Sequence, residues 1–253
     1  MAFDVYVGSM TRFYRREWEN AGQRLAREMG AKYNMIYAGG EPDPPPPADE
    51  IRDVIGLWCA ELTEGLRDLK CGEIKWNEGD EAPYFTERPA WEGYAGLLLW
   101  TAYAEQPKLT PPAILPERWE SDLAYKKSSS PNHPSLYQQI LRANLWIPAD
   151  FNAVVEGPDL CGEQAVIGST FELKRALDHL AHSRPPILQG ESIPETKQKS
   201  KWASLFGARR KQVAENPAQK GNSLIACAGQ GLSIFRQLAD KACENRLPIM
   251  LSY

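Results

Sequence analysis

The stretch AWEGYAGLLLWTAYA, residues 90–104, is the most apolar helix-forming segment of the chain. Its large apolar side chains recur along the whole segment, which predicts a helix at the centre of the core. Gly96 and Thr101 interrupt the apolar run, which falls short of the ~20 residues needed to cross a bilayer. We therefore expect a protein that folds around this helix and does not enter a membrane.

Helical spacing of apolar residues predicts four further helices around this segment. They span residues 15–29, 48–69, 170–182 and 223–245. Gly30 lies where a C-cap would end the first of them, and Ser169 lies where an N-cap would begin the third. Gly229 and Gly231 weaken the last helix, and close packing against another helix explains them better than a phosphate site does.

Short runs rich in β-branched and aromatic residues predict the strands. They lie at residues 3–7, 32–37, 145–147, 153–155 and 248–253. The first two flank the helix at 15–29, so we expect an opening strand–helix–strand unit whose crossover is long enough for parallel pairing. The sequence thus predicts a single large domain, residues 1–253, of the α+β class with a mixed β-sheet and covering helices; the α/β class is the alternative.

Proline-rich and polar stretches separate these elements. Four successive prolines, Pro44–Pro47, fix φ and remove four backbone donors, so residues 39–47 are expected to form an extended loop. Residues 135–144 are predicted to form a short helix. Residues 184–221 are polar without sustained periodicity, and we expect them to be a polar surface excursion.

The composition is that of a globular protein with an acidic balance. Of 253 residues, 43% are hydrophobic and 25% are charged, and the formal net charge is −4. This balance disfavours a nucleic-acid binder, whose affinity rests on cationic contacts with phosphates. Five cysteines without a C-x-x-C pair are typical of free buried thiols in a reducing cytosol. The N-terminus lacks the basic start and apolar run of a secretory signal, so we expect a cytoplasmic protein.

Charge is distributed unevenly along the chain. Residues 41–92 hold 14 acidic residues against 5 basic ones, a net charge of −9. Residues 197–220 hold 7 Lys or Arg and a single acid, a net charge of +6. Clustered carboxylates repel one another, which lowers stability unless cations or a basic partner offset the repulsion. This pattern is more typical of a protein that meets a charged macromolecule than of one that transforms a small molecule.

The acidic segment is the candidate binding surface. Its carboxylates flank the proline loop and follow the helix at 48–69, beside aromatic residues of the kind that anchor interfaces. The predicted partner-binding residues are Glu41, Asp43, Asp49, Glu50, Asp53, Glu78, Asp80, Glu81 and Tyr84. We expect them to dock on a basic protein surface, such as a nuclease cleft that holds phosphates, because complementary charge raises association rates. The alternative is an ordinary solubilising surface.

Other motifs are less specific. His179 and His182 lie three residues apart on a predicted helix and could present two metal ligands, although histidines near a helix C-terminus also interact favourably with the helix dipole. Residues 11–16 form a basic and aromatic cluster that could bind a phosphate, but we favour pairing with Glu17, Glu19 or the acidic segment. We therefore predict no catalytic residue, cofactor or metal.

Three blocks of the sequence carry a family resemblance. They are DVYVGSMTRFY at residues 4–14 with Trp18-Glu19 after it, LWIPADF at residues 145–151, and Ile167-Gly168-Ser169. These blocks resemble a bacterial family of cytoplasmic immunity proteins that neutralise polymorphic or type VI secreted toxins, including restriction-endonuclease-like effectors. The resemblance implies a non-enzymatic protein that binds one cognate toxin tightly and blocks its active site. It assigns no binding residues.

Two other functions stay open at the level of sequence. One is a small-molecule hydrolase or transferase of unknown substrate, with a cleft near Arg12, Arg15 and the strand ends; it predicts a deep pocket with convergent polar groups. The other is an adaptor subunit that places residues 197–220 on an acidic partner. A neighbouring reading frame that encodes a secreted toxin would favour the immunity protein over both.

Overall fold

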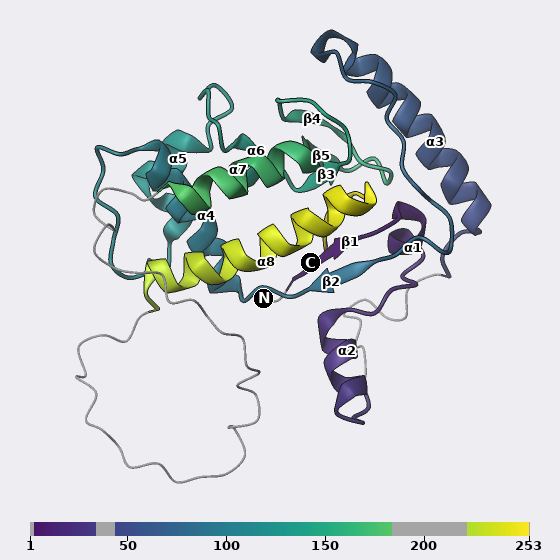
Figure 1. Ribbon diagram of the computed structural model, residues 1–253, viewed down its shortest axis with the longest axis horizontal. Helices are drawn as coiled ribbons and strands as arrows, with labels where there is room; N and C mark the ends of the chain where they lie inside the picture. The colour runs from purple at the N-terminus through teal and green to yellow at the C-terminus, as the bar shows by residue number, and fades with distance from the viewer. Residues whose placement is uncertain (1–2, 34–43, 184–221, 253) are drawn as a thin grey trace.

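Six strands of the described residues form one mixed sheet, in the order β2–β1–β6–β3–β5–β4 (Figure 1). The computed structural model describes residues 3–33, 44–183 and 222–252. The strands are β1 (Asp4–Val7), β2 (Phe85–Glu87), β3 (Leu145–Ile147), β4 (Val155–Pro158), β5 (Gln164–Ser169) and β6 (Ile249–Ser252). Among these strands β3 and β5 pair in parallel, and the other neighbours pair antiparallel. The predicted α+β domain with a mixed sheet is confirmed.

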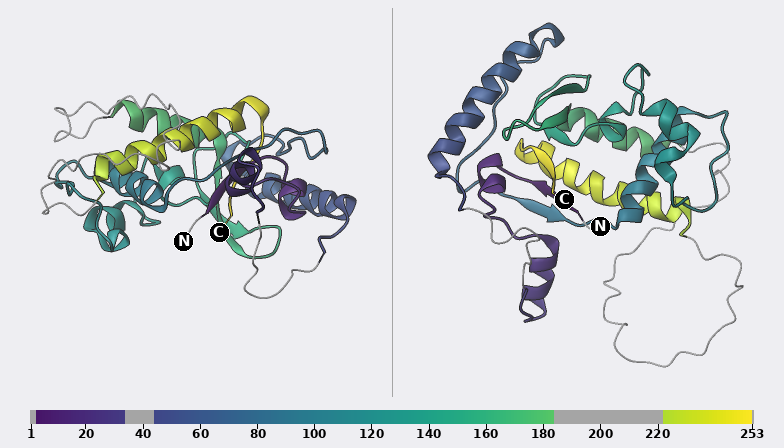
Figure 2. Two further views of the ribbon diagram at one scale, coloured as in Figure 1. Left: turned by 90° about the horizontal axis from the view of Figure 1, so that it is seen from below. Right: turned by 180° about the vertical axis from the view of Figure 1, so that it is seen from behind.

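Helices cover both faces of this sheet (Figures 1 and 2). The longer ones are α2 (Ala21–Glu28), α3 (Ala48–Gly65), α4 (Trp91–Glu105), α7 (Thr170–His182) and α8 (Leu224–Asn245). The shorter ones are α1 (Met10–Tyr14), η1 (Arg67–Leu69), η2 (Trp119–Ser121), α5 (Leu123–Ser128) and α6 (Gln138–Leu141). α4, α7 and α8 pack on one face of the sheet, and α1 and α3 pack on the other.

Alternation of side chains along the strands divides the core into two apolar clusters. Val5 and Val7 of β1 pack with α4, α7 and α8, whereas Tyr6 packs with α1 and α3. In β3, Trp146 joins the first cluster and Leu145 joins the second. All five side chains are buried. The sheet is therefore covered on both faces, and the charged surface of the protein belongs to the covering layers.

α4 is the central helix that its composition predicts, and it is buried along most of its length. A carbon added at Gly96 would lie 2.6 Å from Cys227 Cβ, and one added at Gly231 would lie 2.2 Å from the Gly93 carbonyl oxygen. These glycines let α4 and α8 approach closely, which confirms the packing role predicted for Gly231. In the described part of the chain no helix, α4 included, is both long and apolar enough to span a membrane.

The layer of α1 and α3 covers the second face of the sheet. Ile51, Ile55 and Trp58 form the predicted apolar face of α3 and are buried. Trp58 Nε1 donates a hydrogen bond of 2.9 Å to the Pro158 carbonyl, which ties α3 to the edge strand β4. The helix predicted over 48–69 is confirmed as α3 followed by η1.

The first predicted helix is wrong at its start. Instead of one helix over 15–29, the chain forms α1 and α2, with Arg16 between them in the left-handed conformation at φ 59°. Asn20 begins α2 through a capping box, in which its side chain and that of Gln23 each accept the other residue's backbone N–H. Gly30 follows α2 at φ 65°, as expected for a helix end.

Pairing of β1 with the second strand of the predicted opening strand–helix–strand unit is also wrong. β1 is paired on both edges with antiparallel strands, β2 and β6, that come from much later in the chain. Of the strand predicted at 32–37, Lys32 and Tyr33 are irregular, and the other residues lie outside the described part of the chain. Neighbourhood in the sequence is therefore a poor guide to the partners of β1.

The second half of the chain follows the predictions more closely. β3, α7, α8 and β6 confirm the elements predicted at 145–147, 170–182, 223–245 and 248–253. β4 begins later than predicted, and β5 is a strand that the sequence analysis missed. The helix predicted at 135–144 shrinks to α6. Residues 184–221, predicted as a polar excursion, lie outside the described residues.

Candidate interaction surface

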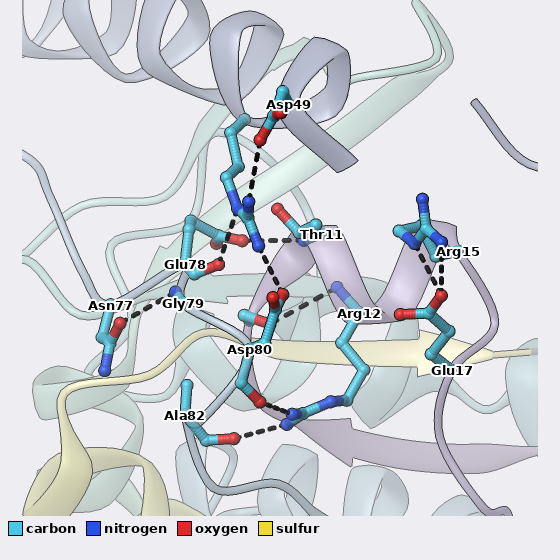
Figure 3. A network of polar contacts seen from close by, with 12 residues as sticks. Thr11, Arg12, Arg15, Glu17, Asp49, Asn77, Glu78, Gly79, Asp80 and Ala82 are labelled. Atoms are coloured by element: carbon cyan, nitrogen blue, oxygen red, sulfur yellow. Dashed lines mark hydrogen bonds and ion pairs between the residues drawn. The ribbon is translucent and has the colours of Figure 1, made fainter. Parts of the chain in front are cut away.

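The structure brings acidic residues from two segments into one cluster, which Figure 3 shows from close by. Arg52 of α3 donates a hydrogen bond to Asp49 Oδ1 at 3.0 Å and another to the Glu78 carbonyl at 3.2 Å. The same guanidinium pairs with the Asp80 carboxylate. One side chain thus joins the first turn of α3 to the loop over residues 77–82.

Glu78 closes the N-terminus of α1. Its carboxylate oxygens accept hydrogen bonds from the backbone N–H groups of Met10 at 2.9 Å and Thr11 at 2.7 Å. Trp76 Nε1 donates to the same carboxylate. The first N–H groups of a helix lack partners within it and favour negative charge. Glu78, predicted as a partner-binding residue, is therefore engaged within the chain.

Arg12 holds the same loop from the side of α1. Its guanidinium donates to the carbonyl oxygens of Asp80 and Ala82. It also lies 5.0 Å from the centre of the Tyr84 ring, a cation–π contact. Tyr84 is 36% exposed, and its hydroxyl accepts the Glu19 backbone N–H at 3.4 Å. The loop is thereby fixed by two arginines, Arg12 and the one on α3.

Three further residues of the basic and aromatic cluster at 11–16 also make contacts within the chain. Arg15 pairs with Glu17 at 2.5 Å, and this hydrogen bond holds the pKa of the Glu17 carboxyl below its ordinary value. Phe13 and Tyr14 pack against the second apolar cluster. These contacts favour the predicted pairing with Glu17 and the acidic segment over a phosphate clamp.

The remaining predicted residues differ in their exposure. Glu50, Asp53 and Glu81 are exposed and form no ion pair with any other described residue. Glu41 and Asp43 lie outside the described residues. The carboxylates that a partner can reach are thus carried by the outer face of α3 and by the loop beside it.

Two exposed apolar residues of α3 escaped the sequence analysis. Val54 is 47% exposed and Leu57 is 69% exposed. Carboxylates lie four and seven residues before and after Leu57, and this spacing puts them on the same face of the helix. They are Asp53, Glu61, Glu50 and Glu64. The sequence did hold a signal for them, because both residues fall off the helical spacing of the buried residues Ile51, Ile55 and Trp58.

An open groove of about 430 Å³ lies along another flank of α3. Gly56 and Ala60 line it from the helix, and Ile74 and Trp76 line it from the extended segment opposite. Cys59 also lines the groove, and burial raises the pKa of its thiol to about 12. A thiol that stays protonated at neutral pH is a poor nucleophile, so this groove offers no activated cysteine.

The two histidines considered as metal ligands make other contacts. His179 Nδ1 lies 2.7 Å from the Tyr137 hydroxyl, and His182 Nδ1 lies 2.6 Å from the Asp178 carbonyl. Both histidines stand in the last turn of α7, where the helix dipole favours positive charge. Across residues 3–33, 44–183 and 222–252, no group of three or more His, Cys, Asp or Glu is arranged to hold a metal ion.

Comparisons of the chain with models of protein families, with curated proteins and with solved structures give no match. The class of the protein is therefore defined by its own geometry. It is an α+β protein in which a loop held by two arginines adjoins a helix with an exposed acidic and apolar face.

Proposed function

We propose that this chain is an immunity protein that binds a secreted toxin with a basic surface and blocks its active site. The observation that carries the proposal is the outer face of α3, where the exposed carboxylates of Glu50 and Asp53 have no ion pair with the described residues. Exposed negative charge on a rigid element suits a cationic partner. The resemblance of residues 4–14 and 145–151 to immunity proteins supports the same class.

The loop beside α3 is held in a way that suits binding. Three of its contacts with Arg12 and Arg52 go to backbone carbonyls, namely those of Glu78, Asp80 and Ala82. These three contacts fix the backbone of the loop, while Arg52 also pairs with the carboxylates of Asp49 and Asp80. A surface that is ordered before it meets its partner loses less conformational entropy on binding.

The proposed partner is a nuclease toxin. A nuclease active site gathers cationic groups to hold phosphates, and arginine in particular matches the geometry of carboxylates as well as phosphates. Carboxylates on α3 would occupy those cations and exclude the nucleic acid. In this proposal the chain acts in the cytoplasm, where a nuclease reaches its substrate, and performs no chemistry itself.

The test is growth of cells that express the product of the neighbouring reading frame together with this chain. The wild-type chain is expected to restore growth, and the purified proteins are expected to form a 1:1 complex. Replacing three exposed carboxylates, Glu50→Lys, Asp53→Lys and Glu81→Lys, should abolish protection, because each change replaces attraction by repulsion.

A matched control keeps the same change in net charge on a different surface. Glu92→Lys, Glu117→Lys and Glu120→Lys alter exposed residues that lie outside α3 and the adjoining loop. This variant should protect as the wild type does. Protection by the α3 variant, or equal loss in both variants, would refute the acidic face as the binding surface.

A further inference from the structure

Leu57 stands exposed in the middle of the acidic face of α3. At 69% it is the most exposed large apolar residue among those that the structure describes. A single exposed leucine is common on protein surfaces and has no meaning alone. The carboxylates one and two turns away on both sides of it are the second feature, and they distinguish this leucine from others.

Leu136 provides the comparison within the same chain. It is 58% exposed, close to the value of Leu57, but no acidic residue lies within four positions of it in the sequence. Leu136 therefore lacks the flanking run of carboxylates that surrounds Leu57, and the nearby Glu105 carboxylate, which accepts a hydrogen bond from Ser135, is largely buried. Leu57 differs from Leu136 in its surroundings and not in its accessibility.

Like charges repel one another on the acidic face of α3, although Glu50 in the first turn also interacts favourably with the helix dipole. Glu50 and Asp53 are like charges three residues apart, and so are Glu61 and Glu64, and such pairs destabilise a helix. Glu64 pairs with Arg67, while the other three form no ion pair with the described residues. Leu57 itself packs in neither of the two apolar clusters. A partner that brings the opposite charge and an apolar contact would relieve the repulsion between the carboxylates and would bury the leucine.

We infer that Leu57, with Val54 beside it, is the apolar anchor of the docking face. The occupant is a basic protein element that presents an apolar side chain or pocket surrounded by Lys and Arg. The inference rests on the proposed function, because that element belongs to the toxin. An apolar centre that loses its water inside a charged rim is where interfaces concentrate binding energy, and the rim steers the approach.

Charge complementarity limits which partner can occupy the docking face. A second copy of this chain would bring two acidic faces together, and like charges across an interface weaken it strongly. Residues 197–220 of this chain have the right sign of charge and form the competing occupant. The experiments below separate a toxin from both.

The first experiment measures the Kd for the purified product of the neighbouring reading frame. Leu57→Gln removes the apolar contact without changing charge and should raise the Kd roughly tenfold or more. Leu136→Gln makes the same change at a matched exposed site and should leave the Kd unchanged. Because both side chains are exposed, both variants should melt as the wild type does, which separates lost binding from lost folding.

The second experiment places a photo-crosslinking amino acid at position 57 or at position 136 of the full chain. Position 57 should crosslink to the product of the neighbouring reading frame, and position 136 should not. A crosslink from position 57 to residues 197–220, or to a second copy, would overturn the inference.

The failures of the two proposals are distinguishable. If the wild type binds the product tightly and Leu57→Gln binds it equally well, the anchor is wrong and the proposed function stands. If the wild type neither binds the product nor protects cells from it, the proposed function is wrong and the anchor falls with it.

Discussion

The two helical layers that cover the sheet are held by different contacts. α4 and α8 meet through Gly93, Gly96 and Gly231, inside the larger of the two apolar clusters. α1 and α3 cover the other face with a smaller cluster, and Arg12 and Arg52 hold the adjoining loop by polar contacts. The first layer is packed through small residues, whereas the second leaves an acidic helix face open.

This difference separates stability from recognition. Close packing tolerates little change in volume, so the contact of α4 with α8 is expected to dominate the free energy of unfolding. α3 is fixed along one apolar face, so its outer residues are free to serve a partner. The predictions that follow test whether the two layers divide these tasks.

The largest effect is expected from Gly231→Val in α8. The new side chain would begin 2.2 Å from the Gly93 carbonyl oxygen, where backbone must move, so the free energy of unfolding should fall by about 3 kcal/mol. Urea denaturation measures this change. Gly56→Ala in α3 is the control, because nothing lies within 4 Å of the added carbon, and it should raise stability by ~0.5–1 kcal/mol. A Gly231→Val variant as stable as the wild type would contradict the dominant role assigned to the contact of α4 with α8.

A smaller loss is expected from Glu78→Ala, which tests the polar layer. The substitution leaves the backbone N–H groups of Met10 and Thr11 without their acceptor, so the free energy of unfolding should fall by ~1–2 kcal/mol. The control is Glu81→Ala, an exposed change in the same loop, which should stay within ~0.5 kcal/mol of the wild type. Equal stability of the two variants in thermal unfolding would show that Glu78 has no structural role.

The smallest effect depends on pH and concerns Asp178, which pairs with Lys174 of α7 and Arg236 of α8. Burial alone would raise the pKa of the Asp178 carboxyl, but its hydrogen bonds with these two cations outweigh burial and hold it below the ordinary value. Because the pKa of Asp178 is lower in the folded state, its ionised carboxylate stabilises the fold above the unfolded-state pKa of ~3.9. This stabilisation is lost as the pH falls through the folded-state pKa.

Asp178→Asn should therefore lower the melting temperature slightly near neutral pH. The difference from the wild type should shrink as the pH falls below ~3.9 and disappear below the lower folded-state pKa, where the wild-type carboxyl is protonated in both states. Melting curves over this pH range measure the difference. A difference that persists in acid would mean that the substitution acts through packing and not through charge.

Dense apolar periodicity made part of the fold predictable from sequence. α4, α7 and α8 bury long apolar faces, so their positions follow from spacing alone. The strand pairing did not follow, because β1 pairs with segments that begin at Phe85 and Ile249. β5 was missed because it runs directly into α7, with Ser169 as both the last residue of the strand and the N-cap of the helix.

The candidate surface was predictable only in outline. The excess of acids between residues 41 and 92 indicated a charged face, but not that Glu78 serves α1, whose N–H groups are 67 and 68 positions away. Exposure of Leu57 was accessible in principle, since it lies off the face defined by Ile51 and Ile55. Contacts between distant segments, in contrast, required the structure.

The most direct test of the docking face is the association rate with the product of the neighbouring reading frame, measured by stopped flow across ionic strength. Steering by the carboxylates of α3 predicts that the wild-type rate falls about tenfold or more between low and high salt. It also predicts that the variant with Glu50→Lys, Asp53→Lys and Glu81→Lys associates slowly at low salt. A wild-type rate that is independent of salt and matches that of the variant would contradict the account.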